Sequence, residues 1–393
     1  MFEEIIFKAK AATQKGNWSL ANQYLQQLTV EKNLNVRQVK EALDIALEIL
    51  EWGEFQERWD VAKIFPKFGE IALDPLIEIA GDKEAVLEHR WFAARLLGKF
   101  NSPEAIAALV DLLQTTDEED LANIASSSLA ELGKTSIDGL SNLLANSETR
   151  LLATKALAQI RSQEAIKPLL TVVKDDDIAV RSTAIEALTS VRDNRIPPIL
   201  ISALKDPASA VRKEAIIGLG LRTDLREELN LVALIKPLLY DFNWEVCQQA
   251  AFALSRQKTD VAAAALFEVL NSPATPPILQ ISLIHSLAWM ESLASLSYLE
   301  LSLSALSPES VLEIIRVFGR IKTANLKPKA AQILLNFFYS QNSLVETIPI
   351  QQGLANAWGQ LQEKVAVDAL MELKEKPEKR VSLQAIAALK NFT

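Results

Sequence analysis

Cysteine and histidine are the residues from which metal and thiol chemistry would be expected, and this sequence holds few of them. It contains one cysteine, Cys247, and two histidines, His89 and His285. An ordinary zinc site needs three or four such ligands, and a disulfide needs two cysteines. The sequence therefore predicts no protein-only metal site and no internal disulfide, and its single cysteine fits a reducing cytosol.

The motifs of several large enzyme classes are also missing. The sequence has no Gly-rich phosphate-binding loop, no serine elbow and no convincing pair of catalytic acids among its scattered carboxylates. We therefore expect a protein that is not an enzyme on its own and that holds no cofactor by itself.

Composition points to helices. The chain has 393 residues, of which 49% are hydrophobic and 23% are charged, with only 12 Gly and 15 Pro. Ala, Leu, Glu and Lys fill most of the remainder, and these residues favour helix over sheet. An all-α fold follows, in either several domains or one repeat array with a continuous core.

Charge and hydropathy limit the expected partners. The formal net charge is −9 and the isoelectric point is near 5.1, so polyphosphates and anionic lipid surfaces would repel the chain. The start, "MFEEIIFKAK", has acids where a secretory signal needs basic residues. The most apolar window, "PPILQISLIHSLAWM", is too short to cross a bilayer. We expect a cytoplasmic protein that binds no nucleic acid and does not insert into membranes.

A repeat dominates the organisation of the chain. "DDDIAVRSTAIEALT" (175–189) and "DPASAVRKEAIIGLG" (206–220) match at six positions, each pair 31 residues apart. Val180, Ala184 and Leu188 lie at i, i+4 and i+8, the spacing of one helical stripe. Looser copies are "HRWFAARLL" (89–97), "TRLLATKAL" (149–157), "EVCQQAAFAL" (245–254) and "RVSLQAIAAL" (380–389).

Another amphipathic segment precedes each of these helices. Examples are "EAIAALVDLLQ" (104–114), "EAIKPLLTVVK" (164–174), "IPPILISALKD" (196–206) and "LVALIKPLLYD" (231–241). The repeating unit is thus predicted to be a helix, a short turn and a second helix. A pair of this size cannot bury its apolar face alone, so neighbouring pairs must stack on it.

The acid-rich turn followed by "xVRxxAxxAL", seen at Asp175–Leu188 and Asp206–Leu219, resembles the HEAT repeats, and in particular their phycobilisome-lyase-like branch. The resemblance implies an α-solenoid, a superhelix of about nine or ten helical hairpins, over residues 66–393. Residues 1–65 do not fit the pattern. "AKAATQKGNWSLANQYLQQL" looks like a tetratricopeptide-type helix pair, and Trp52, Phe55, Trp59 and Ala62 are spaced as one aromatic helical stripe. We therefore expect an N-terminal helical cap over 1–65.

In HEAT proteins the turn aspartate and an arginine of the second helix form a ladder between repeats. The resemblance assigns this role to Asp175, Asp206, Arg90, Arg150, Arg181 and Arg212. The acid would cap the second helix while a neighbouring arginine pairs with it bidentately, and such a ladder would set the stacking register. Direct ligand binding by these residues is the alternative.

Two chemically capable residues, Cys247 and His285, depart from the repeat. Cys247 takes the position of Arg212, so it is either a small buried residue or a thiolate beside a guanidinium, available as a ligand for a metal shared with a partner. His285 is aligned with Ala184, Ala215 and Ala250, which predicts either a core histidine or a base that lines a pocket with Trp289. Glu88 and His89 are adjacent, but the HEAT-type hydroxylase that holds two irons has several such pairs, and this sequence has no second one.

The resemblance also implies that the second helices line a concave face. Several positions on them that face away from the stripe are apolar, and these residues either pack between repeats or contact a partner. The candidates for partner contact are Trp91, Phe92, Leu151, Leu152, Ile217, Phe252, Leu283, Ile284 and Leu287.

Two functions remain open. The first is a non-catalytic, chaperone-like scaffold or adaptor that holds a protein client on its concave face. In length and repeat type the chain is similar to the cyanobacterial HEAT-repeat proteins that interact with the A-type iron–sulfur carrier IscA, which suggests an iron–sulfur carrier as client and a cluster shared with it. The alternative is a phycobiliprotein bilin lyase subunit of the E/F type, with a bilin near His285 and Trp289.

Overall fold

The computed structural model describes residues 2–28 and 34–392, and in these ranges the regular secondary structure is entirely helical. This confirms the expected all-α class and the α-solenoid architecture. The chain divides into two units, Met1–Val191 and Arg192–Thr393.

The first unit contains α1 (Phe2–Thr13), α2 (Trp18–Leu28), α3 (Val36–Trp52), α4 (Phe55–Ala62), α5 (Leu73–Gly81), α6 (Leu87–Leu97), α7 (Pro103–Thr115), α8 (Glu119–Leu132), α9 (Ile137–Leu143), α10 (Ser147–Ile160), α11 (Ile166–Val172) and α12 (Ile178–Thr189).

The second unit contains α13 (Ile196–Ala203), α14 (Ser209–Gly220), α15 (Leu231–Ile235), α16 (Trp244–Gln257), α17 (Asp260–Leu270), α18 (Pro277–Met290), α19 (Leu293–Ser302), α20 (Pro308–Gly319), α21 (Lys327–Phe338), α22 (Ile348–Leu361), α23 (Val367–Lys374) and α24 (Lys379–Leu389).

Short 3-10 segments lead into or follow several of these helices. They are η1 (Phe65–Ala72), η2 (Gly133–Ser136), η3 (Gln163–Ala165), η4 (Thr223–Leu225), η5 (Lys236–Tyr240), η6 (Ala324–Leu326), η7 (Ser343–Glu346), η8 (Lys364–Ala366) and η9 (Lys390–Phe392).

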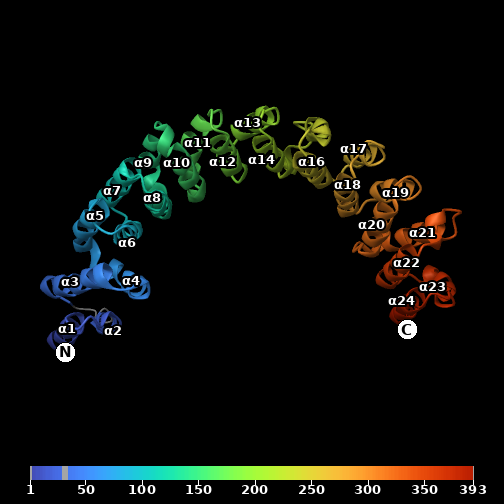
Figure 1. Cartoon of the computed structure of the whole chain (residues 1–393). Helices are drawn as coiled ribbons and strands as arrows, with labels where there is room; N and C mark the ends of the chain where they lie inside the picture. The colour runs from blue at the N-terminus through green and yellow to red at the C-terminus, as the bar shows by residue number, and fades with distance from the viewer. Residues whose placement is uncertain (1, 29–33, 393) are drawn as a thin grey trace. The chain divides into compact units, whose positions relative to one another are not determined.

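The helices from α5 onward alternate as the first and second members of ten hairpins, from α5/α6 to α23/α24. In the first unit α7, α9 and α11 form one layer and α8, α10 and α12 form the other; in the second unit α17, α19 and α21 are similarly separated from α18, α20 and α22 (Figure 1). Second helices pack on the second helices of adjacent hairpins, for example α14 on α16 and α16 on α18. Within each unit a hairpin thus buries its apolar face against its neighbours.

Local sequence explains where the hairpin helices begin. The Ser102 hydroxyl accepts a hydrogen bond from the Ala105 N–H at the start of α7, and the Thr259 hydroxyl does the same for Ala262 in α17. Proline lies in the first turn of α7 and α13, where a missing N–H costs little. Pro237 lies where α15 ends and η5 begins, at the bend expected for such repeats.

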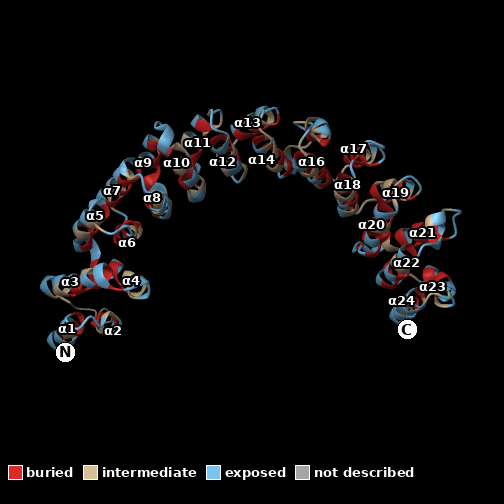
Figure 2. Cartoon of the chain, in the orientation of Figure 1, coloured by how far each residue is buried: buried red, intermediate tan, exposed pale blue. Residues whose placement is uncertain are grey.

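The core lies between the two layers (Figure 2). The predicted stripe of α12, Val180, Ala184 and Leu188, is buried, and so is its copy in α14 at Val211, Ala215 and Leu219. Small residues let neighbouring helices approach closely: a Cβ added at Gly220 would lie 2.7 Å from the Cβ of Ala253 in α16.

The predicted single aromatic stripe over residues 52–62 is wrong. Trp52 is the last residue of α3 and Phe55 is the first of α4, because the helix stops at Gly53 and restarts after Glu54. Trp52 and Phe55 are exposed. The boundary between a cap and the repeats at residue 65 remains a prediction.

Candidate functional site

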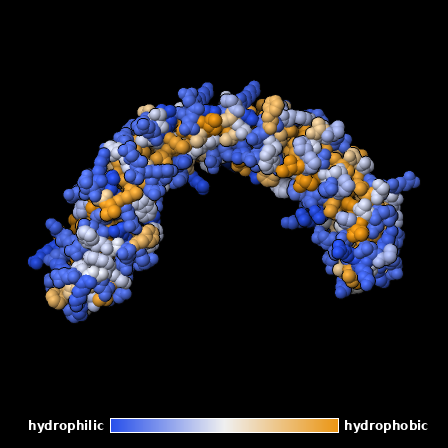
Figure 3. Space-filling view, in the orientation of Figure 1, coloured by the Kyte–Doolittle hydropathy of each residue, from blue (hydrophilic) through white to orange (hydrophobic). Residues whose placement is uncertain are grey.

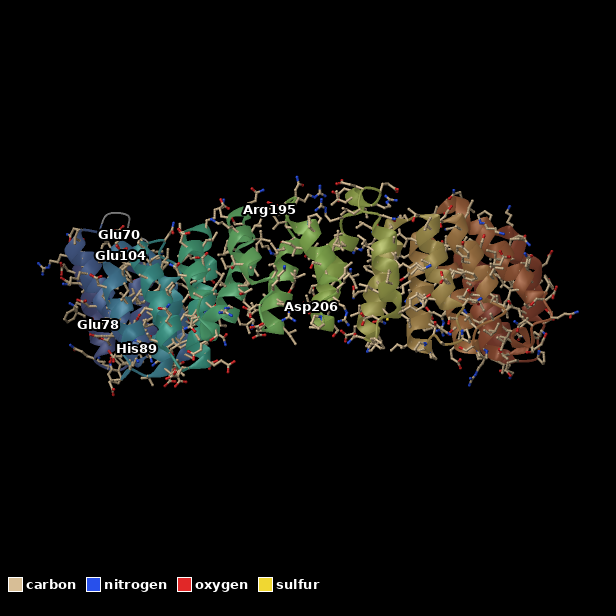
Figure 4. The ribbon with its side chains drawn as sticks, turned by 90° about the horizontal axis from the view of Figure 1, so that it is seen from above. Glu70, Glu78, His89, Glu104, Arg195 and Asp206 are labelled. Carbon is tan, nitrogen blue, oxygen red and sulfur yellow. The ribbon has the colours of Figure 1, made fainter. Side chains whose placement is uncertain are left out.

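The two long edges of each unit carry different turns. In the first unit Glu70 and Glu104, near the starts of first helices, lie along one edge, while Glu78 and His89, near the turn inside a hairpin, lie toward the other; in the second unit Arg195 and Asp206 are separated in the same way (Figure 4). The turns inside the hairpins, such as the one at Asp206, are where the ladder is found.

Two arginines of the ladder reach the turn of the following hairpin. Arg150 Nη1 donates to Asp175 Oδ2 at 2.8 Å. Arg212 Nε and Nη2 donate to Asp241 Oδ2 and Oδ1 at 2.7 and 2.8 Å. The planar guanidinium suits this bidentate contact, which joins one hairpin to the next.

Ladder arginines also donate to backbone carbonyl groups of the turn in their own hairpin. Arg212 Nη1 donates to the carbonyl oxygens of Asp206 and Pro207, and Arg181 Nη1 donates to those of Asp175 and Asp176. Arg90 Nε donates to the Ala80 carbonyl oxygen. The predicted ladder arginines therefore satisfy carbonyl groups left free where the first helix ends.

Sequence reasoning missed Asp241 as a member of the ladder. Asp241 ends the segment "LVALIKPLLYD" and precedes α16 as Asp206 precedes α14. This equivalent position could have identified Asp241 from the sequence. Its pairing with Arg212 could not have been predicted, because that depends on the distance between adjacent hairpins.

We expected the turn aspartates to cap the second helices directly, but they do not. Asp175, Asp206 and Asp241 each accept a hydrogen bond through Oδ1 from the N–H two residues later. The side chain that caps α12 is instead that of Asp177, and the one that caps α16 is that of Asn243. The ladder aspartates thus hold the turn, and in α12 and α16 the residue two positions later caps the helix.

Cys247 takes the place of a ladder arginine and still contacts the turn of its own hairpin, but through an uncharged side chain. Its Sγ donates to the Asp241 carbonyl oxygen at 3.1 Å, and the residue is buried. Burial raises the pKa of the Cys247 thiol, which favours the neutral form over a reactive thiolate. One hairpin later Gln280 donates to the Thr275 carbonyl and accepts from Ser310 Oγ at 2.8 Å, so the ladder continues in uncharged form.

His285 is neither a core histidine nor aligned with the small stripe residues. The stripe of α18 is Leu279, Leu283 and Leu287, all buried, while His285 is 53% exposed. Its Nε2 lies 2.9 Å from Glu313 Oε1 of α20. His285 therefore corresponds to Phe252 of α16 and faces solvent.

Glu88 pairs with Arg58, while the adjacent His89 is buried. Glu88 Oε2 accepts from Arg58 Nη1 at 2.5 Å. His89 is buried, and burial, together with the nearby charge of Arg58, lowers its pKa. Within residues 2–28 and 34–392 no group of three or more His, Cys, Asp or Glu side chains is placed to hold a metal ion.

Four candidates for partner contact are core residues. Phe92, Leu283, Ile284 and Leu287 have no exposed surface. The interpretation of these four as contact residues is wrong, because the predicted register in α18 was shifted by two positions and because Phe92 packs against Phe55 and Trp91.

The other candidates reach the surface in three places. In the first unit Trp91 and Trp59 flank the Arg95 guanidinium, whose central carbon lies 5.6 and 4.5 Å from the two ring centroids. Leu151 and Leu152 are half-buried on α10. In the second unit Ile217 and Phe252 line the same hollow between α14 and α16.

We call this hollow and its surroundings the α14–α16 groove, lined by Ile217, Gly220, Leu221, Gln249, Phe252, Ala253 and Arg256. Its volume is about 130 Å³. Leu221 and Phe252 are 47% and 41% exposed. Hydrophobic residues reach the surface over α16 and α18 in Figure 3.

Trp289 of α18 extends the groove. Its ring centroid lies 6.1 Å from that of Phe252, and 48% of the residue is exposed. Arg256 stands over the Phe252 ring at 4.8 Å and Lys258 stands over the Trp289 ring at 5.0 Å. The groove therefore combines exposed aromatic faces with cations. Leu221, Arg256 and Lys258 lie outside the positions that the repeat pattern had singled out.

No helix in the described ranges has both the length and the apolar content that a bilayer crossing requires. No protein of curated function matches the sequence. Residues 43–130 and 137–220 match the family model of the HEAT repeats, which confirms the predicted repeat type over 66–130 and 137–220. The match begins at residue 43, inside the region that we expected to form the cap.

Three solved structures resemble the chain. A structure concerning Kap95p binding to RanGDP matches with a TM-score of 0.60 and 14% identity, over 91% of this chain and 55% of that chain. An engineered protein matches over 94% of this chain and 98% of its own with 21% identity and a TM-score of 0.36. Human deoxyhypusine hydroxylase in complex with glycerol matches over 66% of this chain and 100% of its own, with 17% identity and a TM-score of 0.30. The first of these supports the solenoid fold.

Proposed function

We propose that this HEAT-repeat chain is a non-catalytic scaffold that binds a protein client through its second helices. The observation that carries the proposal is the α14–α16 groove, where Leu221, Phe252 and Trp289 are exposed side by side with two cations. Aromatic residues and arginine are the most frequent energetic anchors of protein interfaces.

The arrangement of the ladder supports the same role. The ladder contacts lie at the turns inside the hairpins, so they hold the stack while leaving the exposed positions of the second helices unused. A rigid stack with a variable surface lets contact residues differ between hairpins without loss of the fold. The structure concerning Kap95p and RanGDP shows that a solenoid of related fold takes part in protein binding.

Only the resemblance in length and repeat type limits the choice of client, and it favours an iron–sulfur carrier protein. Cys247 is a poor shared ligand, since it is buried and donates to a backbone carbonyl. We therefore propose binding of the carrier protein itself, without a cluster held through Cys247.

Site-specific photo-crosslinking tests the function. A photoreactive amino acid placed at Leu221 or Trp289 reports on the second helices, and one at Val261 of α17 or Leu293 of α19 reports on exposed positions of first helices. We expect a purified A-type carrier to crosslink at the first two positions and not at the last two. Equal crosslinking at all four would contradict binding through the second helices.

A control separates the scaffold from a bilin lyase subunit. Free bilin is mixed with the protein, and the absorption spectrum is recorded with and without the carrier. We expect no sharpened, red-shifted band. Such a band, abolished by changing Trp289 to alanine, would favour the lyase function instead.

A further inference from the structure

The α14–α16 groove has an unusual charge for this chain. The net charge of the protein is −9, yet Arg256 and Lys258 stand over the exposed rings with no carboxylate within ion-pair distance among the described residues. Glu291, which follows α18, accepts hydrogen bonds from the backbone N–H groups of Lys322 and Thr323.

The floor of the groove is made by small residues. Gly220 and Ala253 bring α14 and α16 together, and no side chain fills the space between Ile217, Leu221 and Phe252. The volume of about 130 Å³ is close to the roughly 150 Å³ of a cavity that accepts benzene. One apolar side chain of a partner fits there.

Equivalent positions in the first unit have a different character. A hollow between α10 and α12 is lined by Lys155, Gln159, Arg161, Glu186 and Ser190, among others. Glu186 of α12 and Ser190 just after it occupy the places that Ile217 of α14 and Leu221 just after it occupy one repeat later. The apolar, cation-rimmed surface therefore belongs to particular hairpins and is not a general consequence of the repeat.

We infer that the α14–α16 groove, with Trp289 at its edge, docks an acidic peptide segment of the client that carries one apolar anchor residue. The anchor enters the hollow beside Phe252, and carboxylates of the segment pair with Arg256 and Lys258. This inference rests on the proposed scaffold function and names the chemistry of the partner that the groove recognises.

Three fluorescent peptides of about ten residues test the inference, since an extended chain of that length spans about 33 Å and so covers three helices packed about 10 Å apart. They share a single Phe anchor at the same position and differ only in having Glu, Ser or Lys at the positions around it. Anisotropy titrations with the full chain are expected to rank the Glu peptide first, about tenfold tighter than the Lys peptide, with a preference that weakens as salt rises.

Two sets of variants locate the binding. R256E/K258E is expected to reverse the preference between the Glu and Lys peptides, whereas K205E/K379E, which changes two exposed lysines elsewhere, keeps it. Phe252→Ala is expected to weaken all three peptides about tenfold, and Val261→Ala, an exposed residue of α17, leaves them unchanged.

The inference is overturned if the three peptides bind equally, if none binds, or if R256E/K258E leaves the ranking intact. It is also overturned if a single-stranded RNA of similar length competes better than the Glu peptide, or if Phe252→Ala dissociates a dimer of the chain. Carrier crosslinking at Leu221 that persists in these cases would keep the scaffold function while rejecting the acidic-segment mode.

Discussion

The Arg212 guanidinium and the Asp241 carboxylate form a bidentate ion pair between adjacent hairpins, with N···O distances of 2.7 and 2.8 Å. Only 15% of the Arg212 side chain and 7% of the Asp241 side chain are exposed. Arg212 also donates to the carbonyl oxygens of Asp206 and Pro207. One side chain therefore joins the turn of its own hairpin to the turn of the next.

Removing the carboxylate should destabilise the second unit. We expect Asp241→Ala to lower the free energy of unfolding by about 3 kcal/mol, because it leaves a largely buried guanidinium without its counter-ion. Guanidinium chloride denaturation followed by tryptophan fluorescence measures the change. Asp193→Ala is the control, since Asp193 pairs with Arg195 in an exposed turn, and it should change stability much less. Equal effects of the two substitutions would contradict the importance of the buried pair.

The contribution of Asp241 should depend on pH in a definite direction. Burial pushes the pKa of Asp241 up, but hydrogen bonds from Arg212 and from the Asn243 N–H outweigh it and hold this pKa below the ordinary value of 3.8. Because the folded pKa is the lower one, the stabilisation is complete above that ordinary value and is lost as pH falls through the folded pKa. The stability difference between the wild type and Asp241→Asn should therefore be constant near neutrality and shrink below about pH 4. A difference that grows on acidification would refute this assignment.

Cys247 should react slowly in the native protein. It is buried, its Sγ donates to the Asp241 carbonyl, and burial raises the pKa of the thiol. We expect alkylation by iodoacetamide to be at least about tenfold slower than for a free cysteine, and to become complete only in denaturant. Mass spectrometry of the timed reaction measures this. Fast native alkylation, with loss of client binding, would restore Cys247 as a functional thiol.

Substitution of Leu219 should affect the stability of the fold, whereas substitution of Leu221 should affect peptide binding. Leu219 is fully buried in the stripe of α14, so Leu219→Ala should cost about 2 to 5 kcal/mol in the free energy of unfolding. Leu221 is 47% exposed beside the groove, so Leu221→Ala should change stability by less than about 1 kcal/mol and weaken the Glu peptide. The two effects are read by denaturation and by anisotropy, and a large stability loss for Leu221→Ala would show that it belongs to the core.

The Tyr339 hydroxyl should ionise only at unusually high pH. Its hydroxyl donates to Glu372 Oε1 at 2.6 Å, and this hydrogen bond, with burial, raises the pKa of Tyr339 to about 12. An ultraviolet titration should show a phenol that ionises well above the ordinary value of 10.0, and this step should disappear in Tyr339→Phe. Glu372→Gln should move it back toward the ordinary value; an unchanged titration would mean that the hydrogen bond is absent in solution.

Much of the repeat architecture could be predicted because it rests on short-range periodicity. The i, i+4, i+8 stripe at Val180, Ala184 and Leu188 is read within one helix and is buried as expected. The match to the HEAT repeats at 137–220 confirms the repeat type there. The predicted register of α18 was wrong. We aligned His285 with Ala250, 35 positions earlier, whereas equivalent residues of α16 and α18 lie 33 positions apart.

The sequence by itself determined the helical class, the hairpin repeat and the arginines of the ladder, since these depend on the 3.6-residue period and on residue types at fixed places in a turn. Only the tertiary structure decided which apolar residues reach the surface and which partner each ladder group meets. Phe92 is buried and Phe252 is exposed although both are aromatic residues of second helices. Burial depends on side chains from other helices, such as Phe55 of α4 against Phe92 of α6, and local periodicity does not encode which residues of other helices come close in space.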